Sequence, residues 1–235
     1  MIRFENVSFC YNRGHQVLHD FSLELSGGGV YGLLGKNGTG KSTMLYLMMG
    51  LLHPQRGRVT VDDTDTSLRD PGLLADMFIV PEEYDLPHVS LQRYVDAIAP
   101  LYPRFSHELL AHCLGDFEMD GDIHLGSLSM GQKKKVYMSI ALASGTRYLF
   151  MDEPTNGLDI LSKSQFRKVV ISGMSPEKTI LISTHQVHDV ERLIDHVAII
   201  SNEGVLLNAP LVEQDAPIDL EQLFIQTVQS KASQS

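Results

Sequence analysis

The sequence is poor in features that define several classes of protein. It has only two cysteines, Cys10 and Cys113, far apart and without metal-like spacing, so neither a disulfide framework nor a cysteine metal cluster is expected. The longest apolar run, Met44–Leu52, is too short to cross a bilayer. The first residues, Met1–Asn6, place an acidic side chain where a signal peptide needs an apolar core. These absences predict a soluble, cytoplasmic protein with free thiols.

Basic charge is also scarce. The 29 acidic side chains outnumber the 19 basic ones, and the net charge at pH 7 is −10. A protein that grips nucleic acid through its phosphates usually has the opposite balance, so no nucleic-acid partner is expected. The 235 residues, 43% of them hydrophobic, are enough for one globular domain with a sizeable core.

Short apolar runs alternate with amphipathic stretches along the chain. The apolar runs predict strands at Phe21–Leu25, Val30–Leu34, Met77–Val80, Tyr148–Met151, Thr179–Ser183 and Val197–Ile200. The amphipathic stretches predict helices at Lys41–Met49, Ser90–Leu101, Ser106–Leu114, Gly131–Ala143, Ile160–Gly173 and Val187–Ile194. This alternation predicts an α/β fold with a mainly parallel central sheet, and the segments before about Val61 resemble antiparallel hairpins laid against it.

Two regions depart from the alternation. Between residues 87 and 133 the strands stop and two or three helices follow one another, which predicts a helical subdomain inserted into the main domain. The last six residues, 230–235, have low complexity and predict a flexible tail. We therefore expect a single domain over residues 1–229.

The segment GLLGKNGTGKST follows an apolar run and opens a helical stretch. Gly35, four further residues and then Gly40, Lys41 and Ser42 form the pattern of a phosphate-binding P-loop. Its glycines let backbone N–H groups face phosphate oxygens, Lys41 would reach the β- and γ-phosphates, and the Ser42 hydroxyl would hold Mg²⁺. The predicted nucleotide ligands are Gly35, Asn37, Gly38, Thr39, Gly40, Lys41, Ser42 and Thr43. The alternative is a plain glycine-rich turn, which leaves eight constrained positions unexplained.

A second apolar strand, in RYLFMDEPTNGLD, ends in two carboxylates. Asp152 and Glu153 follow the run, and Pro154 stops the strand. Because neighbouring strand residues point to opposite faces, one carboxylate can face Mg²⁺ while the other faces an attacking water. We assign Asp152 to the metal and Glu153 to the water, as general base. The alternative is a pair of acids that caps the next helix.

A third apolar strand, in TILISTHQ, ends at His185. A histidine at this position can donate a hydrogen bond to a γ-phosphate, which makes His185 a catalytic candidate, whereas a structural role is the favoured interpretation of an isolated histidine. His185 and His188 have helical spacing, but no third ligand follows at an interval typical of zinc, so a zinc site is not predicted.

The stretch SLSMGQKKKV, Ser127–Val136, has the features of an anion site at the start of a helix. Ser129 offers a hydroxyl, Gly131 allows close approach of a backbone, and the N–H groups of a helix N-terminus favour an anion. Ser129 and Gln132 also form the S-x-x-Q pattern of a capping box, and both interpretations can hold. Lysines 133–135 lie where the helix dipole disfavours cations, and a phosphate ahead of them would offset that cost. A lysine run is nevertheless usually a solvated face.

These motifs together resemble the ATP-binding subunits of ATP-binding cassette (ABC) transporters. The resemblance extends from Phe4 to about Thr227, and the motifs come in the family's order: the P-loop, a switch segment at Val80–Glu82, LSMGQ at Leu128–Gln132, the acidic strand, GLD at Gly157–Asp159, and His185. It implies a head-to-tail pair of subunits in which each LSMGQ covers the ATP on the other subunit's P-loop. The residues it adds to nucleotide binding are Ser129, Gly131, Gln132 and Asp159.

The resemblance also assigns two residues before the signature. The family places an aromatic side chain against adenine, which matches Tyr11 by position, with Phe9 as a rival and a half-buried strand residue as the alternative. Many members carry glutamine in the switch segment, where this chain has Glu82. A carboxylate oxygen binds Mg²⁺ at least as well as an amide oxygen, so Glu82 joins Ser42 and Asp152 as an expected metal ligand.

The resemblance implies an ATPase that uses ATP and Mg²⁺ and powers transport through a separate transmembrane permease. Its partner would be a second copy or another ABC ATPase, and it would lie in the cytoplasm, bound to the inner face of the membrane through the permease. Pro81–Glu83 and the short ending Asp219–Gln229 resemble the exporter-type, ABC-2-like subfamily. The alternative is a soluble single-cassette ABC ATPase that acts in protein or cofactor assembly. A small-metabolite kinase would leave LSMGQ unexplained.

Overall fold

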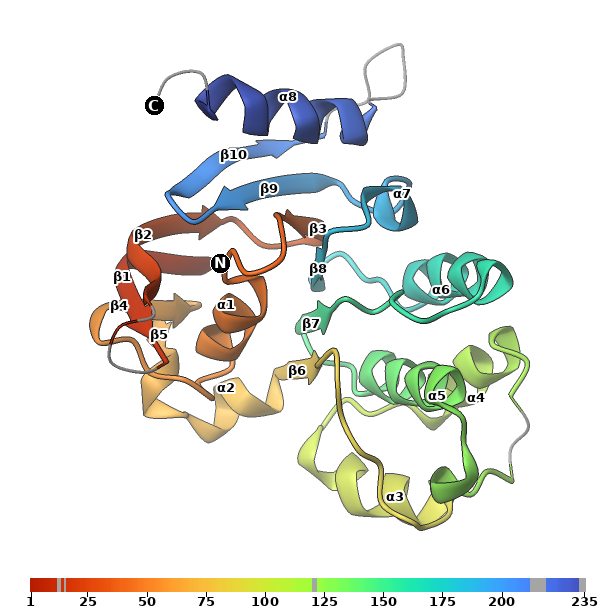
Figure 1. The fold of residues 1–235 in the computed structure, drawn as a ribbon. Helices are drawn as coiled ribbons and strands as arrows, with labels where there is room; N and C mark the ends of the chain where they lie inside the picture. The colour runs from red at the N-terminus through yellow and green to blue at the C-terminus, as the bar shows by residue number, and fades with distance from the viewer. Residues whose placement is uncertain (12–13, 15, 120–121, 212–218, 233–235) are drawn as a thin grey trace.

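The computed structural model describes residues 1–11, 14, 16–119, 122–211 and 219–232, which build two β-sheets and the helices around them (Figure 1). The smaller sheet has the strand order β2-β1-β4-β5, and its neighbouring strands are antiparallel. Its strands are β1 (Ile2–Cys10), β2 (Gln16–Leu25), β4 (Arg56–Val61) and β5 (Thr64–Asp65). The antiparallel arrangement predicted for the segments before Val61 is therefore confirmed.

The larger sheet has the strand order β10-β9-β3-β8-β7-β6 and is parallel except for the edge pair of β9 and β10. Its strands are β3 (Gly29–Leu34), β6 (Met77–Val80), β7 (Tyr148–Asp152), β8 (Thr179–Thr184), β9 (His196–Ser201) and β10 (Gly204–Pro210). The predicted α/β fold with a mainly parallel sheet is confirmed. The sequence does not predict β10, because none of its residues is fully buried and its pattern is correspondingly weak.

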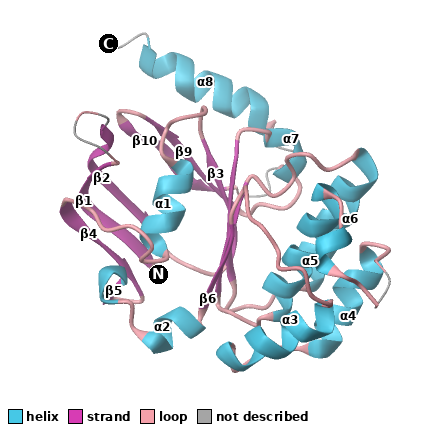
Figure 2. Ribbon diagram, turned by 60° about the horizontal axis from the view of Figure 1, so that its bottom comes forward, coloured by secondary structure: helices cyan, strands magenta, loops and turns pink. Residues whose placement is uncertain are grey.

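Helices lie on both sides of the larger sheet. They are α1 (Lys41–Met48), α2 (Pro71–Ala75), α3 (Leu91–Ile98), α4 (His107–Asp116), α5 (Met130–Ala143), α6 (Ile160–Ser172), α7 (Val187–Val190) and α8 (Leu220–Ala232). Figure 2 shows α1 between the two sheets and α3 to α6 gathered on the opposite face of the larger sheet. Among the described residues, none of the helices combines the length and apolar character that crossing a membrane requires.

Two predicted helices end earlier than expected, and a helix that was not predicted extends into the expected tail. α3 stops at Ile98 and a 3₁₀ turn follows, because Pro100 has no N–H group to continue the helix. α7 stops at Val190, where the chain turns so that Leu193 and Ile194 enter the core before β9. α8 continues to Ala232, three residues into the segment predicted as a flexible tail, and residues 233–235 lie outside the described chain.

Two hydrophobic cores hold the larger sheet from its two faces. One lies between the sheets and surrounds α1, whose Met44, Leu45 and Met48 are fully buried. The other packs α5 and α6 against the opposite face and includes Met138 and Phe166. Strands β7 and β8 are buried along their whole length, so the positions of their carboxyl ends are fixed by packing on both sides.

One cation is buried inside this framework at an energetic cost. Lys178, which precedes β8, is 4% exposed, and its Nζ donates a hydrogen bond to the Leu142 carbonyl oxygen at 3.3 Å. Burial lowers the pKa of Lys178 to about 8, because an ammonium group is poorly solvated there. The Leu142 oxygen also accepts from the N–H of Gly145 at 3.3 Å, so it keeps a partner without the lysine.

We expect Lys178→Met to raise the free energy of unfolding at pH 7 by up to about 3 kcal/mol, which corresponds to a pKa lowered from 10.5 to about 8. Because the folded pKa lies below the unfolded one, the unfolded chain binds more protons between about pH 8 and 10.5, and the stability of the wild type rises in that window. The advantage of the methionine should therefore shrink as pH rises. Urea unfolding of both proteins at pH 7 and pH 9.5 measures the difference.

Lys36→Met, at an exposed position, is the control and should change the free energy of unfolding by less than about 1 kcal/mol. A methionine at 178 that destabilises the protein at pH 7 would contradict the argument from burial.

Candidate functional site

A cleft of about 310 Å³ opens where the central parallel strands end. Because β3, β8 and β7 are paired in parallel, their carboxyl ends and the segments that follow meet at one edge of the sheet. The cleft is lined by Tyr11, Val17, Asn37, Gly38, Gly40, Lys41, Ser42, Thr43, Glu82 and Glu153. Residues from four separate motifs of the sequence thus meet at one place.

The P-loop connects β3 to α1 and requires two glycines for different reasons. Gly40 has φ 94° and caps α1, a conformation that favours glycine. A Cβ atom on Gly35 would lie 2.7 Å from the Thr39 Oγ1 and 2.9 Å from the Ile200 carbonyl oxygen, so no side chain fits there. No side chain caps the N-terminus of α1, and its first turn carries no acidic residue. The start of α1 can therefore accept an anion.

Lys41, the first residue of α1, is buried beside the loop. Its Nζ donates to the carbonyl oxygens of Gly35 at 2.9 Å and Lys36 at 3.3 Å, and it lies 3.8 Å from Glu153 Oε1. Burial lowers the pKa of Lys41, while the carboxylates of Glu153, Asp152 and Glu82 oppose that shift. The lysine is held by weak neutral acceptors that a phosphate could replace.

Asp152 is the last residue of β7, and its carboxylate is buried. It accepts hydrogen bonds from the hydroxyl groups of Ser183 and Ser42. Burial raises the pKa of Asp152 above its ordinary value, and those two hydrogen bonds oppose the shift. Ser42 and Asp152, both predicted as Mg²⁺ ligands, therefore lie next to each other.

Glu153 lies beyond the end of β7, and its backbone is left-handed, with φ 44°. Its carboxylate accepts from Thr184 Oγ1 at 2.9 Å and from the N–H of His185 at 3.1 Å, and its Oε1 lies 2.8 Å from His185 Nδ1. The argument from strand alternation was wrong, because Glu153 is not part of the strand. The two carboxylates have different neighbours because the chain turns sharply between them.

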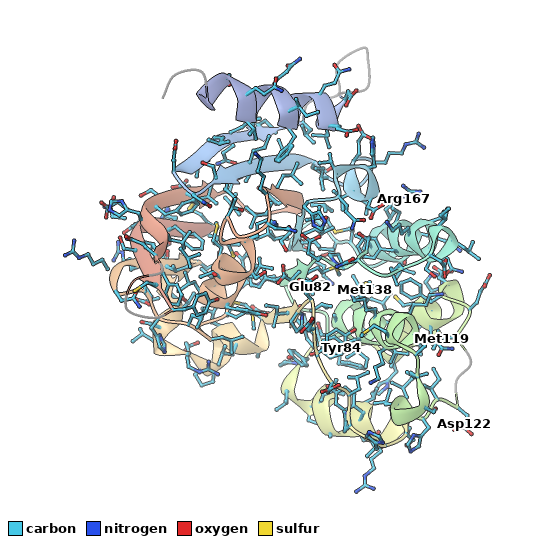
Figure 3. The ribbon with its side chains drawn as sticks, in the orientation of Figure 1. Glu82, Tyr84, Met119, Asp122, Met138 and Arg167 are labelled. Atoms are coloured by element: carbon cyan, nitrogen blue, oxygen red, sulfur yellow. The ribbon has the colours of Figure 1, made fainter. Side chains whose placement is uncertain are left out.

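Glu82 follows β6 and reaches the same cleft from the other side. Figure 3 shows it where β6 ends, between the side of the molecule that holds α1 and the side that holds α5. Its Oε1 accepts a hydrogen bond from Asn156 Nδ2 at 2.9 Å. Asn156 is not among the site residues predicted from the sequence. Its place three residues after Glu153, in the same turn, is the signal that could have identified it.

The structure separates the two aromatic candidates near the N-terminus. Tyr11 is 50% exposed, lines the cleft, and its hydroxyl lies 3.0 Å from Thr43 Oγ1. Phe9 is buried in the core and contacts Tyr11 edge-on, with ring centroids 4.9 Å apart. Of the two, only Tyr11 lines the cleft, so Phe9 is no longer a rival.

The LSMGQ segment and Asp159 do not line this cleft. Ser129 caps α5, and Gln132 completes the predicted capping box, with hydrogen bonds of 3.3 and 3.0 Å between the two residues. Asp159 caps α6 by accepting from the N–H of Ser162 at 2.7 Å, which keeps the pKa of the carboxyl below its usual value. Ser129, Gln132 and Asp159 are exposed, so these residues form a surface of the molecule and not a wall of its own cleft.

The lysine run after LSMGQ is not a solvated face. Lys134 is buried, and its Nζ donates to the carbonyl oxygens of Asn156 at 2.7 Å and Glu153 at 3.3 Å. Lys135 reaches Gln165 Oε1 at 3.1 Å. The expectation fails because α5 lies against the loop that follows β7, whose carbonyl oxygens accept from Lys134, and against α6, whose Gln165 accepts from Lys135.

A family model described as ABC transporter matches residues 18–156, more than half of the chain. YfeB of Yersinia pestis, described as a chelated iron transport system membrane protein, is 31% identical over 236 aligned positions that cover 94% of this chain and 77% of YfeB. The Nod factor export ATP-binding protein I of Bradyrhizobium diazoefficiens is 28% identical over 201 positions, covering 79% of this chain and 63% of that protein.

A solved structure supports the fold independently. The dimeric post-hydrolysis state of the ATP-binding cassette MJ0796, bound to ADP and Pi, covers 91% of this chain and 100% of that chain, with a TM-score of 0.78 and 22% identity. The matched family model, the relatives and the motifs in the cleft agree. The chain therefore belongs to the ABC transporter family, as an ATP-binding subunit that hydrolyses ATP to energise transport through a membrane partner.

Proposed function

We propose that this subunit binds MgATP in its P-loop cleft and hydrolyses it only when a second ABC ATPase subunit, another copy or a related chain, closes over it head to tail. The observation that carries the proposal is the separation of the two anion-binding features. The P-loop lines the cleft, whereas Ser129 at the start of α5 and Asp159 at the start of α6 are exposed and do not line it. One chain thus carries the P-loop half of one nucleotide site and, on a separate surface, the Ser129 and Asp159 half of another.

Gly131 supports the same division. A Cβ atom built on it meets no atom within 4 Å beyond its own stretch of helix, and its backbone is helical, so nothing among the described residues requires glycine there. Met130 beside it is 69% exposed, an unusual state for an apolar side chain. Both features suit a surface that another subunit's nucleotide approaches closely. Ser129, Gly131, Gln132 and Asp159 would then bind the partner's ATP.

In the subunit's own cleft, the triphosphate would lie across the start of α1. The P-loop residues Gly35 to Gly40 and Thr43 would supply backbone and hydroxyl donors, and Lys41 would leave its carbonyl acceptors for the β- and γ-phosphates. Tyr11 would stack against adenine, since its exposed ring lies beside Thr43 at the rim of the cleft. Stacking of this kind is worth about 1–3 kcal/mol per base.

The residues at the inner end of the cleft fit Mg²⁺. Ser42 and Asp152 are in direct hydrogen-bond contact, and Glu82 lines the same cleft, so hard oxygen donors from three segments converge. These three residues would hold the ion, which supplies neutralisation of the charge that develops on the transferred phosphoryl group. Glu82 would serve in place of the glutamine that many family members carry.

Glu153 would act as the general base for the attacking water. Its carboxylate is held by Thr184 and by the backbone N–H of His185, which fixes the direction of its oxygen atoms. His185 Nδ1 is already in contact with that carboxylate, so the imidazole is positioned to bridge the base and the γ-phosphate. The buried setting excludes bulk water and strengthens these interactions.

We further propose that the subunit works beneath a separate permease at the inner face of the membrane, and that transport runs outward. The segment Pro81–Glu83 supports the exporter type. One relative's name specifies export, of Nod factor, whereas another belongs to a chelated iron transport system. The sequence pattern of this chain itself therefore carries the choice of direction.

Glu153→Gln should retain ATP binding and lose hydrolysis by at least about 100-fold, because the amide keeps the shape of the side chain but cannot take a proton from water. With MgATP the variant should accumulate as a dimer in size-exclusion chromatography. Glu177→Gln, at an exposed position, is the control and should match the wild type. Wild-type turnover by Glu153→Gln would remove Glu153 as the base.

Gly131→Asp should reduce hydrolysis at least about 10-fold while nucleotide affinity of the dilute, monomeric protein stays within about twofold. The added carboxylate has room in the chain but would repel a phosphate brought by a partner. Gly115→Asp places the same carboxylate at another open, exposed helical glycine, on α4, and should leave turnover intact. Equal turnover of the two variants would contradict a head-to-tail site.

The permease is tested by isolation from membranes. Tagged protein purified from a detergent extract should carry a polytopic membrane protein, and that complex should hydrolyse ATP. Inside-out vesicles containing the complex should then accumulate a substrate only with MgATP outside, as expected for export. Accumulation by right-side-out vesicles charged with MgATP would reverse the assigned direction, and isolation of a soluble assembly factor alone would refute the permease.

A further inference from the structure

Lys134 connects the helix that begins at LSMGQ to the loop that carries Glu153. It lies five residues beyond the Ser129 cap, on the first turns of α5, and is 6% exposed. Its Nζ donates to two main-chain oxygens, those of Asn156 at 2.7 Å and Glu153 at 3.3 Å. A side chain from the outward-facing helix thus ends on the backbone of the segment that would cleave ATP.

The backbone that Lys134 holds is in an uncommon conformation. Glu153 has φ 44°, which costs free energy for a residue with a Cβ atom and persists only where surrounding contacts impose it. Its N–H donates to the Ser183 oxygen at 2.9 Å, and its own oxygen accepts from the Asn156 N–H at 3.1 Å as well as from Lys134. Lys134 is the one side-chain donor among these contacts.

Asn156 extends the contact to the other side of the cleft. Its carbonyl oxygen accepts from Lys134, and its side-chain amide donates to Glu82 Oε1 at 2.9 Å. The Lys134 ammonium group therefore contacts the Glu153 turn directly, and it is linked to Glu82 through Asn156. Both glutamates line the cleft with Lys41.

The position is costly for a lysine, which argues for a specific use. Burial lowers the pKa of Lys134, and the nearby carboxylates of Glu82, Glu153 and Asp152 counter this only through space. Within the described residues, Lys134 has no carboxylate oxygen within 4 Å to pair with. Its hydrogen bonds go to main-chain carbonyl oxygens and not to a carboxylate, so they hold the position of the backbone and do not neutralise a neighbouring charge.

We propose that Lys134 is a positioning residue for hydrolysis, which holds the Glu153 turn and, through Asn156, Glu82 in place for the reaction. The inference rests on the proposed function, in which Glu153 is the base and Glu82 a metal ligand. It adds a direct link within one chain. The start of α5 would bind the partner's nucleotide, and the same helix holds the residues that act on the nucleotide in this chain's own cleft.

The decisive comparison uses two neutral replacements of nearly equal size. Lys134→Met keeps the length of the stem and removes the donor, whereas Lys134→Gln keeps an amide donor. We expect Lys134→Met to lower kcat at saturating MgATP at least about 10-fold with KM and nucleotide Kd within about twofold, and Lys134→Gln to recover a measurable part of kcat. Lys133→Met makes the same change one residue earlier and should leave kcat and KM unchanged.

A structural defect alone is separated by the trapped dimer. In a Glu153→Gln background, Lys134→Met should form the ATP-dependent dimer to the same extent as the single variant, because binding and closure do not depend on the position of the base. If Lys134→Met does not fold, as judged by circular dichroism, Asn156→Leu tests the far end of the link. It removes the donor to Glu82 and should also lower kcat without raising KM.

Three results would overturn the inference. They are a kcat of Lys134→Met within twofold of the wild type, equal losses for the methionine and glutamine variants, and a rise in KM with unchanged kcat. A wild-type kcat for Asn156→Leu would remove the relay to Glu82. A wild-type protein without ATPase activity would refute the proposed function itself, whereas active wild type with unaffected Lys134 variants refutes only the positioning role.

Discussion

The parallel pairing of β3, β8 and β7 is the constraint on which the site depends. Parallel strands end at the same edge, so the loops that follow them meet, although the loop after β3 is more than a hundred residues from the other two in sequence. The two cores fix that edge from both faces, since β7 and β8 are buried throughout. The strand pairing alone is therefore sufficient to bring the P-loop and the two carboxylates together.

The price of this convergence is a concentration of like charge in a poorly solvated place. Asp152 and Glu153 are buried beside the half-buried Glu82, and burial raises the pKa of Asp152. The compensation comes from Lys41 and Lys134, which are buried themselves and lose solvation in turn. Neither lysine is tied to one carboxylate by a short ion pair: Lys41 lies 3.8 Å from Glu153, and both donate to main-chain oxygens. The contacts of Lys41, which lines the cleft, can be exchanged for phosphate oxygens at little cost, which suits a site that binds and releases an anion.

The features that sequence could predict are those encoded locally. The P-loop is recognisable because Gly40 and Gly35 meet backbone requirements within the loop itself, and the buried strands are continuous apolar runs. The features that the sequence could not predict depend on packing between distant segments. Lys134 is buried because α5 lies against the turn after β7, and no pattern around KKK reports that turn. The left-handed backbone of Glu153 likewise follows from contacts with Ser183 and Asn156, so the pleat rule for strands could not place its carboxylate.

Helix α5 combines two tasks that a single rigid element performs well. Its capping box organises the first N–H groups of the helix without help from a ligand, so an arriving phosphate would not have to order them. Fewer than two turns further on, Lys134 reaches the Glu153 turn, and the rest of the helix is packed into the core through residues such as Met138 and Leu142. A displacement of the helix start toward a partner's nucleotide would therefore move the lysine as well, because a packed helix shifts as a body. In this arrangement the response of the chain's own cleft to its partner requires no chain of intermediate residues; one helix and one side chain suffice.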